Sequence, residues 1–166
     1  DEVLFRILLF RFFNSIQTWR LLESALGELT WAAFRLDRYD EVLSEVFTRS
    51  ERIYSAAYIV PPPKLGAQRK HTNHLLLLQQ MLRGGLLNRL QTCASMAKAF
   101  ELLRGYPGMG DFLAYQLLID INYSTLINFD EMVFVVAGPG ARDGLRNCFG
   151  PGARGIEAYL IRYMSD

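Results

Sequence analysis

The chain has 166 residues, a formal net charge of +1 and 51% hydrophobic residues. This composition suits a single globular domain and excludes a long disordered segment. The two cysteines, Cys93 and Cys148, have no metal-ligand spacing, which argues against a zinc site, an iron–sulfur cluster and a disulfide scaffold. The apolar runs are too short to cross a bilayer, so we expect no membrane partner.

The first third of the chain is predicted to be helical. Residues 3–26 have apolar side chains at helical spacing, with a break at 14–15 where a serine can cap a second helix. A short helix is predicted over residues 30–36. Residues 41–49 follow as another helix, for which Asp40 is in position to act as the N-cap.

A proline-rich break precedes the middle of the chain. Residues 54–60 are apolar and end at three prolines, 61–63, which cannot continue a helix. A basic loop then leads to Thr72, the expected cap of a helix over residues 73–83. Two glycines at 84–85 are expected to end that helix.

The second half is predicted to be helical as well. Short helices are expected over residues 86–93 and 96–104, the latter capped by Ser95. An apolar helix over residues 111–121 comes next, and a helix over residues 156–164 is the last.

The pentapeptide Gly-Pro-Gly-Ala-Arg occurs twice in the second half. At 138–142 it is expected to open a helix, and at 150–154 we interpret it as a helix stop that repeats by chance. No alternating, turn-bounded set of strands is present, so the predicted fold class is all-α. We expect one helical domain over residues 1–166, cut from a longer protein.

A Pro-Gly-Met-Gly turn at residues 107–110 joins two predicted helices, which is the pattern of a helix-hairpin-helix over about 96–121. Glycines permit the tight turn and a close approach of the backbone to a ligand. The restarting helix offers unpaired amides and the positive end of its dipole to a DNA phosphate. A plain turn between core helices is the alternative. The residues expected to bind phosphate are Gly108, Met109, Gly110 and Arg104.

Residues 102–114 resemble the hairpin of the helix-hairpin-helix DNA glycosylase superfamily, and residues 7–14 resemble the early helix that lines its base pocket. In that superfamily a catalytic aspartate lies about twenty residues beyond the last glycine of the hairpin. Asp130 stands twenty residues after Gly110 and precedes an apolar run. The resemblance therefore implies a glycosylase-like helical bundle with Asp130 as the catalytic carboxylate and Glu131 as its substitute.

Three departures from the superfamily pattern narrow the chemistry. Phe112 occupies the place of the lysine nucleophile in the strand-cleaving members, so lyase chemistry is not expected. The cysteines of the cluster-bearing members are absent. Asp111 replaces a polar or basic residue at the helix start, where it favours the helix dipole but repels a phosphate that comes too close.

Several segments also resemble a narrower clade, the α-glutamyl/putrescinyl-thymine pyrophosphorylases and the helical domain of 5-hydroxymethyl-deoxyuridine DNA kinases. They are residues 5–14, 69–74, 111–116, 122–124 and 138–142. The resemblance implies thymine hypermodification in DNA, in which an amine displaces pyrophosphate from an activated 5-hydroxymethyl group. It implies DNA as the partner, an associated kinase or modification enzyme, and no bound cofactor. With free cysteines, a cytoplasmic location is expected, or a nuclear one in a eukaryote.

A base must leave the duplex before its ring or methyl group can react, so a pocket with stacking surfaces and a few polar groups is needed. Core packing is the alternative for each aromatic residue. The residues expected to line this pocket are Arg11, Phe13, Asn14, Tyr115 and Gln116.

Positive charge concentrates in the loop after the prolines and at the start of the helix near residue 140. A pyrophosphate group or a DNA backbone needs such charge. A solvated loop is the alternative, and a two-histidine metal pair is disfavoured because no carboxylate cluster adjoins it. The residues expected to bind anions or substrate are Arg69, Lys70, His71, Asn73, His74, Gly138, Gly140 and Arg142.

Three functions remain open at this point. The first is a transferase acting on activated 5-hydroxymethyluracil, in which Asp130 accepts a proton from the amine or holds it in place. The second is a monofunctional glycosylase, in which Asp130 stabilises cationic character at the sugar. The third is a non-catalytic DNA-binding module of a DNA kinase or a defence system, in which Asp130 only caps a helix or turn.

Overall fold

The computed structural model describes residues 1–56 and 60–165, and every regular element within them is helical. Residues 57–59, part of the apolar segment 54–60, lie outside the described residues. The all-α class is therefore confirmed for the described part of the chain. The elements are α1 (Glu2–Phe13), α2 (Ile16–Leu26), α3 (Leu36–Thr48), α4 (Lys70–Arg83), α5 (Leu86–Gln91), α6 (Met96–Arg104), α7 (Asp111–Asn122), α8 (Pro139–Phe149), the 3₁₀ turn η1 (Gly150–Ala153) and α9 (Glu157–Ser165).

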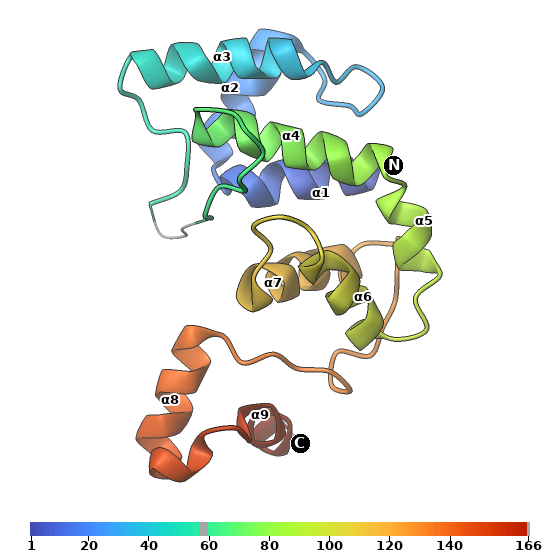
Figure 1. The fold of residues 1–166 in the computed structure, drawn as a ribbon, viewed down its shortest axis with the longest axis vertical. Helices are drawn as coiled ribbons and strands as arrows, with labels where there is room; N and C mark the ends of the chain where they lie inside the picture. Colours follow the sequence, from blue (N-terminus) through green and yellow to red (C-terminus); the bar gives the residue numbers. More distant parts are fainter. Residues whose placement is uncertain (57–59, 166) are drawn as a thin grey trace.

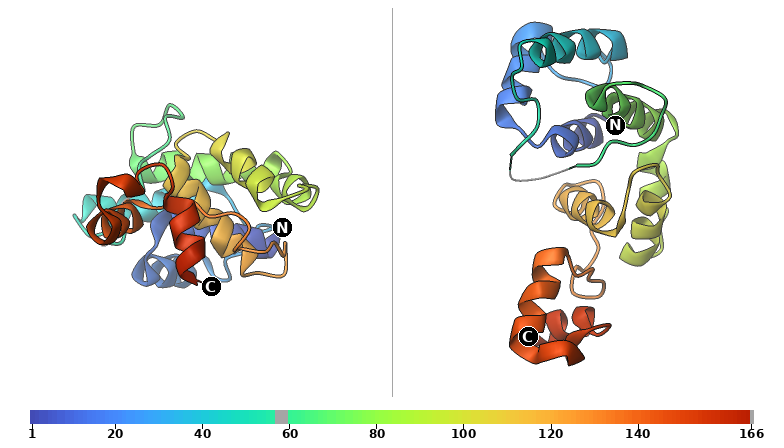
Figure 2. Two further views of the ribbon diagram at one scale, coloured as in Figure 1. Left: turned by 90° about the horizontal axis from the view of Figure 1, so that it is seen from below. Right: turned by 60° about the vertical axis from the view of Figure 1, so that its left-hand side comes forward.

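The helices form an elongated stack (Figure 1). α2 and α3 lie at one end, α1 and α4 lie side by side beneath them, and α6 and α7 follow. α5 connects α4 to α6 along one side. α8 and α9 form the opposite end and pack on each other (Figure 2).

The first helix is the centre of the core. α1 contacts α4 and also α7, so apolar side chains around much of its circumference are covered. Burying each large apolar side chain contributes about 1.5–3 kcal/mol, which makes α1 the main link between the two halves of the stack. Its buried residues are Leu4, Phe5, Leu8, Leu9, Phe12 and Phe13.

The local signals at two helix starts are confirmed. α1 is followed by Asn14, whose φ of 48° lies in the left-handed region, and the Ser15 hydroxyl accepts a hydrogen bond of 3.2 Å from the amide of Thr18. The Ser95 hydroxyl accepts one of 3.3 Å from the amide of Lys98 at the start of α6. Each serine satisfies one of the amides that a helix start leaves without an internal partner.

Three of the predicted helix starts are wrong, and two of them lie before and within α3. Residues 30–36 are mainly a turn, in which the Glu2 carboxylate accepts hydrogen bonds from the amides of Trp31 and Ala32 at 2.6 and 3.2 Å. α3 already begins at Leu36, so Asp40 lies inside it and is not a cap.

α4 likewise begins before the expected cap, at Lys70. The Thr72 hydroxyl lies within the helix and donates to the Asp40 carboxylate at 2.5 Å. The two expected caps therefore join α3 to α4 instead. Both were placed by local preference, and a tertiary contact decided their role.

The boundaries predicted at the glycines are confirmed, whereas α5 ends at Gln91, two residues before the predicted end. α4 ends at Arg83, before the two glycines, and α8 begins at Pro139. α8 ends at Phe149, with Gly150 after it at φ 70°. Among the described residues, no helix is both long and apolar enough to span a bilayer.

Candidate nucleic-acid interface

The turn between α6 and α7 is tightly closed around a buried methionine. The amide of Met109 donates to the Tyr106 carbonyl at 3.1 Å, and the amide of Gly110 donates to the Gly108 carbonyl at 3.3 Å. Met109 is 4% exposed, while Gly108 and Gly110 on either side of it are exposed. The side chain of Met109 thus anchors the hairpin to the core and leaves glycine backbone at the surface.

The two glycines of the hairpin face different surroundings. Gly108 has a φ of 78°, and a Cβ there would lie 3.0 Å from the Cα of Pro63. The close backbone approach at this glycine is therefore to the chain's own proline loop. A Cβ at Gly110 would meet no atom within 4 Å, so no other part of the chain covers this position at the start of α7.

Arg104 lies at the end of α6 and is already engaged with two carboxylates. Its Nε is 2.8 Å from an oxygen of Asp111, and its Nη1 is 3.1 Å from an oxygen of Glu101. The ion pair with Asp111 offsets the negative charge at the start of α7. A phosphate at the hairpin would therefore meet backbone amides first, with Arg104 as a partner only after it leaves a carboxylate.

The residues predicted to line a base pocket occupy several environments. Arg11 forms an ion pair with Asp120 and so links α1 to α7. Phe13 is buried and stacks on Tyr54, with the ring centroids 5.3 Å apart. Asn14 forms the turn after α1. For Phe13 the core-packing alternative describes the structure.

The two predicted pocket residues on α7 are half-buried. Tyr115 contacts the rings of Phe100 and Phe134, which also contact each other, and its hydroxyl donates to the Phe134 carbonyl at 3.4 Å. Burial raises the pKa of Tyr115. Gln116 follows it on the same helix. Tyr115 therefore fastens the segment after α7 to the helix.

The two predicted catalytic carboxylates lie at the C-terminal end of α7. Asn122, the last residue of α7, donates to the Phe129 carbonyl at 3.0 Å and to the Glu131 carboxylate at 3.1 Å. Asp130, between them, is exposed and accepts a hydrogen bond of 2.9 Å from the amide of Met132, so it stabilises a turn. About ten residues of helix separate this end of α7 from its first turn, a distance of about 15 Å.

The residue that the structure brings to the hairpin end of α7 is Gly138. A Cβ at Gly138 would lie 2.7 and 2.9 Å from two ring atoms of Phe112, closer than any side chain permits. The segment after α7 therefore returns along the helix, from Asn122 past Tyr115 to Phe112. α8 then starts beside the start of α7, with Gly140 and the exposed Arg142 in its own first turn.

Most side chains of residues 69–74, the segment predicted to bind anions, make contacts within the protein. His71 is 1% exposed, and its Nε2 lies 3.2 Å from the Ser44 hydroxyl and 3.5 Å from the Asp40 carboxylate. Asn73 is 5% exposed; its amide oxygen accepts from the amides of Leu65 and Ala67, and its amide nitrogen donates to the Ala67 carbonyl. Asn73 therefore holds the loop at residues 65–67, and His71 links α4 to α3.

His74 is the most firmly fixed member of this set. Its Nε2 lies 3.1 Å from the Pro61 carbonyl, which can only accept, so Nε2 carries the proton and Nδ1 accepts from the Tyr54 hydroxyl at 2.8 Å. The ring stacks on Phe12 with the centroids 5.6 Å apart. Burial lowers the pKa of His74 to about 4, which keeps the ring neutral.

The two cations of this segment lie on aromatic rings. The Arg69 guanidinium is 5.3 Å from the ring centre of Phe47, and the Lys70 ammonium is 4.0 Å from that of Tyr54. Burial lowers the pKa of Lys70. Such cation–π contacts hold both side chains against the protein. In the described residues, no cluster of three or more His, Cys, Asp or Glu residues is placed to hold a metal ion.

The chain matches one family of helical domains. Residues 1–166, the whole chain, match the family model described as "5-hmdU DNA kinase, helical domain". The chain belongs to this family. No curated protein and no solved structure matches it.

Three features of this family member were missed in the sequence. They are the contact of Gly138 with Phe112, the ion pair of Arg11 with Asp120, and the position of Arg154 near α8. The Gly138-Pro139 pair signalled a helix start, but nothing in the spacing showed where that start would lie. The Arg11 and Asp120 side chains are separated by 109 residues, so no local pattern links them.

Proposed function

We propose that this chain is the DNA-binding domain of a kinase that acts on 5-hydroxymethyl-deoxyuridine in DNA, and that the hairpin between α6 and α7 contacts the DNA backbone. One observation carries the proposal. A Cβ at Gly110, the N-cap of α7, would meet no protein atom within 4 Å, and the buried Met109 beside it fixes the turn. A helix start of this kind binds a phosphate through its amides and its dipole.

The hairpin is proposed to be a helix-hairpin-helix of the DNA glycosylase kind. Three features support this assignment: α6 and α7 pack on each other, Gly108 makes the turn at positive φ, and α8 begins beside α7. In this arrangement the phosphate contact is independent of base identity. Another part of the protein must therefore recognise the modified base.

A second candidate function is transfer of an amine to an activated 5-hydroxymethyluracil base. The observation in its favour is Asp130, whose carboxylate is exposed and held in one orientation by the Met132 amide, which leaves its second oxygen free to accept a proton. The distance of about 15 Å along α7 places this carboxylate away from the hairpin. No contact in the described residues favours base excision over transfer.

Asp130→Asn distinguishes binding from catalysis without disturbing the turn, because an asparagine oxygen also accepts from the Met132 amide. We expect the Kd for a duplex containing 5-hydroxymethyluracil to stay within about twofold of the native value, since the side chain lies far from the hairpin. Asp37→Asn, an exposed residue of α3, is the matched control for the charge change.

The same samples are incubated with thymine, 5-hydroxymethyluracil and phosphorylated 5-hydroxymethyluracil duplexes, digested to nucleosides and read by mass. If the chain only binds DNA, we expect neither a new nucleoside adduct nor free base. If the native chain forms an adduct with an added amine and Asp130→Asn does not, the chain is a transferase and not only a DNA-binding domain. Failure of the native chain to bind any of the duplexes would overturn the DNA-binding proposal.

A further inference from the structure

A cleft of about 560 Å³ lies between α8, η1 and the start of α9, at the end of the molecule away from α2 and α3. It is separate from the predicted base pocket and from the carboxylates at the end of α7. Three of its lining residues are arginines: Arg142, Arg146 and Arg154.

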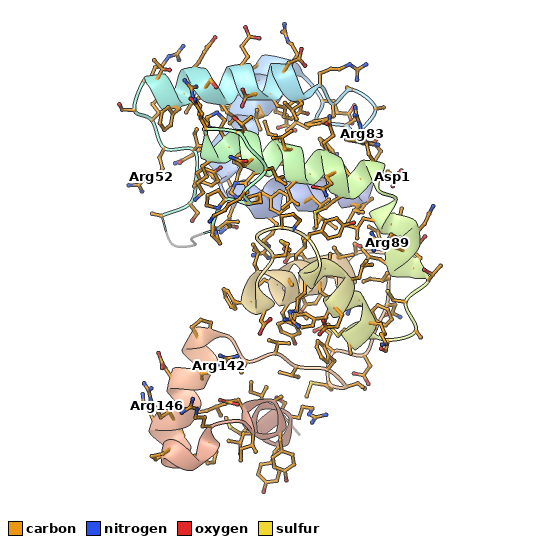
Figure 3. The ribbon with its side chains drawn as sticks, viewed as in Figure 1. Asp1, Arg52, Arg83, Arg89, Arg142 and Arg146 are labelled. Atoms are coloured by element: carbon orange, nitrogen blue, oxygen red, sulfur yellow. The ribbon has the colours of Figure 1, made fainter. Side chains whose placement is uncertain are left out.

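The two copies of the Gly-Pro-Gly-Ala-Arg pentapeptide meet at this cleft. Arg142 ends the first copy and lies one turn before Arg146 on α8 (Figure 3). Arg154 ends the second copy and follows η1. The second copy does stop α8, as the sequence indicated, but the turn it makes also carries its arginine back to the first copy. The repeat therefore supplies two cations to one site.

The charges in the cleft are only partly balanced. Asp143 pairs with Arg146 at 3.0 Å, and the Glu157 carboxylate accepts a hydrogen bond of 2.9 Å from the Gly155 amide. Within the described part of the chain, the side chains of Arg142 and Arg154 have neither a hydrogen bond nor an ion pair. Two guanidinium groups thus line an open cleft without a carboxylate partner.

We infer that this cleft binds phosphate groups, with Arg142 and Arg154 as the two contacting side chains. The planar fork of a guanidinium matches the oxygens of a phosphate, and the first turn of α8 adds its positive dipole end at Pro139. The volume exceeds that of a single phosphate, so the cleft fits two neighbouring groups, as in inorganic diphosphate or in a DNA backbone. The inference does not depend on binding at the hairpin.

The test compares Arg142→Gln/Arg154→Gln with Arg20→Gln/Arg38→Gln. The control pair removes the same charge from exposed arginines of α2 and α3 whose side chains have no partner in the described residues. Inorganic diphosphate binding is measured by calorimetry, and duplex DNA binding by fluorescence anisotropy at several salt concentrations. All four positions are exposed, and thermal melting verifies that both variants fold.

We expect the cleft variant to lose at least about tenfold in affinity for one of the two ligands, and the control to stay within about threefold. Loss of diphosphate binding alone identifies a free diphosphate as the source of the phosphate groups. Loss of DNA binding, with a log–log salt slope smaller by about two, identifies the backbone. The inference is overturned if the native chain binds neither ligand, if neither affinity changes, or if the control loses as much.

Discussion

Replacing His74 with Phe is expected to lower the free energy of unfolding by about 2–4 kcal/mol. A phenyl ring retains the stacking on Phe12 but can neither donate to the Pro61 carbonyl nor accept from the Tyr54 hydroxyl. Both partners then lose a hydrogen bond where His74 is 1% exposed. Urea unfolding at pH 7.5, followed by circular dichroism, measures the change.

A double-mutant cycle separates the hydrogen bond from the packing. Tyr54→Phe alone removes the hydroxyl and leaves the ring over His74, and the double variant removes both partners. We expect the double variant to be less destabilised than the sum of the two single variants, by about 1 kcal/mol. Strict additivity would show that the bond of 2.8 Å between the Tyr54 hydroxyl and Nδ1 contributes nothing.

The same histidine makes the fold sensitive to mild acid. Burial lowers the pKa of His74 to about 4, while an unfolded chain titrates its histidines near 6.5. Between these values the unfolded chain binds a proton that the folded chain excludes, so stability is full above pH 6.5 and falls as the pH drops toward 4. From pH 7.5 to 5.5 we expect a loss of about 1 kcal/mol from His74, which His74→Phe removes.

Replacing Gly110 with Asp is expected to have opposite effects on folding and on DNA binding. Gly110 is the N-cap of α7 with an extended conformation, φ −73° and ψ 169°, which an aspartate adopts without strain. Its carboxylate would accept from the first-turn amides and keep or raise stability by up to about 1 kcal/mol. Those amides can then no longer bind a DNA phosphate, and the aspartate carboxylate repels the phosphate. We expect DNA affinity to fall by at least about tenfold.

Gln17→Glu serves as the control for added charge. It also places one carboxylate in the first turn of a helix, at an exposed position of α2. Stability and DNA affinity are expected to stay close to native in this variant. Equal DNA affinities for Gly110→Asp and the native chain would place the DNA contact away from the hairpin.

The elements predicted well are those decided by a few neighbouring residues. The caps at Ser15 and Ser95 and the glycine stop after α4 rest on backbone groups within four residues of each signal. The tight turn between α6 and α7 is of the same kind. These features depend little on the rest of the fold, so the sequence was sufficient.

The polar run before and within α4 shows why other assignments failed. In the sequence, residues 69–74 are polar and basic, which predicted a site for anions or substrate, with a solvated loop as the alternative. In the fold, the partners of His71 and His74 are Ser44, Asp40 and Tyr54, which come from distant turns of the chain. A satisfied buried histidine and an exposed one have the same sequence signal, and only tertiary packing distinguishes them.

Asp130 shows that the number of residues between two positions does not give their distance in the fold. Twenty residues separate Gly110 from Asp130, but α7 takes up 12 of the residues after Gly110 and carries the chain away from the hairpin. The return along α7 brings Gly138 to Phe112. The number of residues was informative about the order of the elements and not about the distance between side chains.

The most direct measurement of the central claim is an amide chemical-shift map of the chain during titration with a short duplex containing 5-hydroxymethyluracil. We expect the largest changes at residues 108–113, the hairpin and the first turn of α7, with smaller ones at the start of α8. Changes that instead concentrate on α2 and α3, while the hairpin amides stay unmoved, would contradict it.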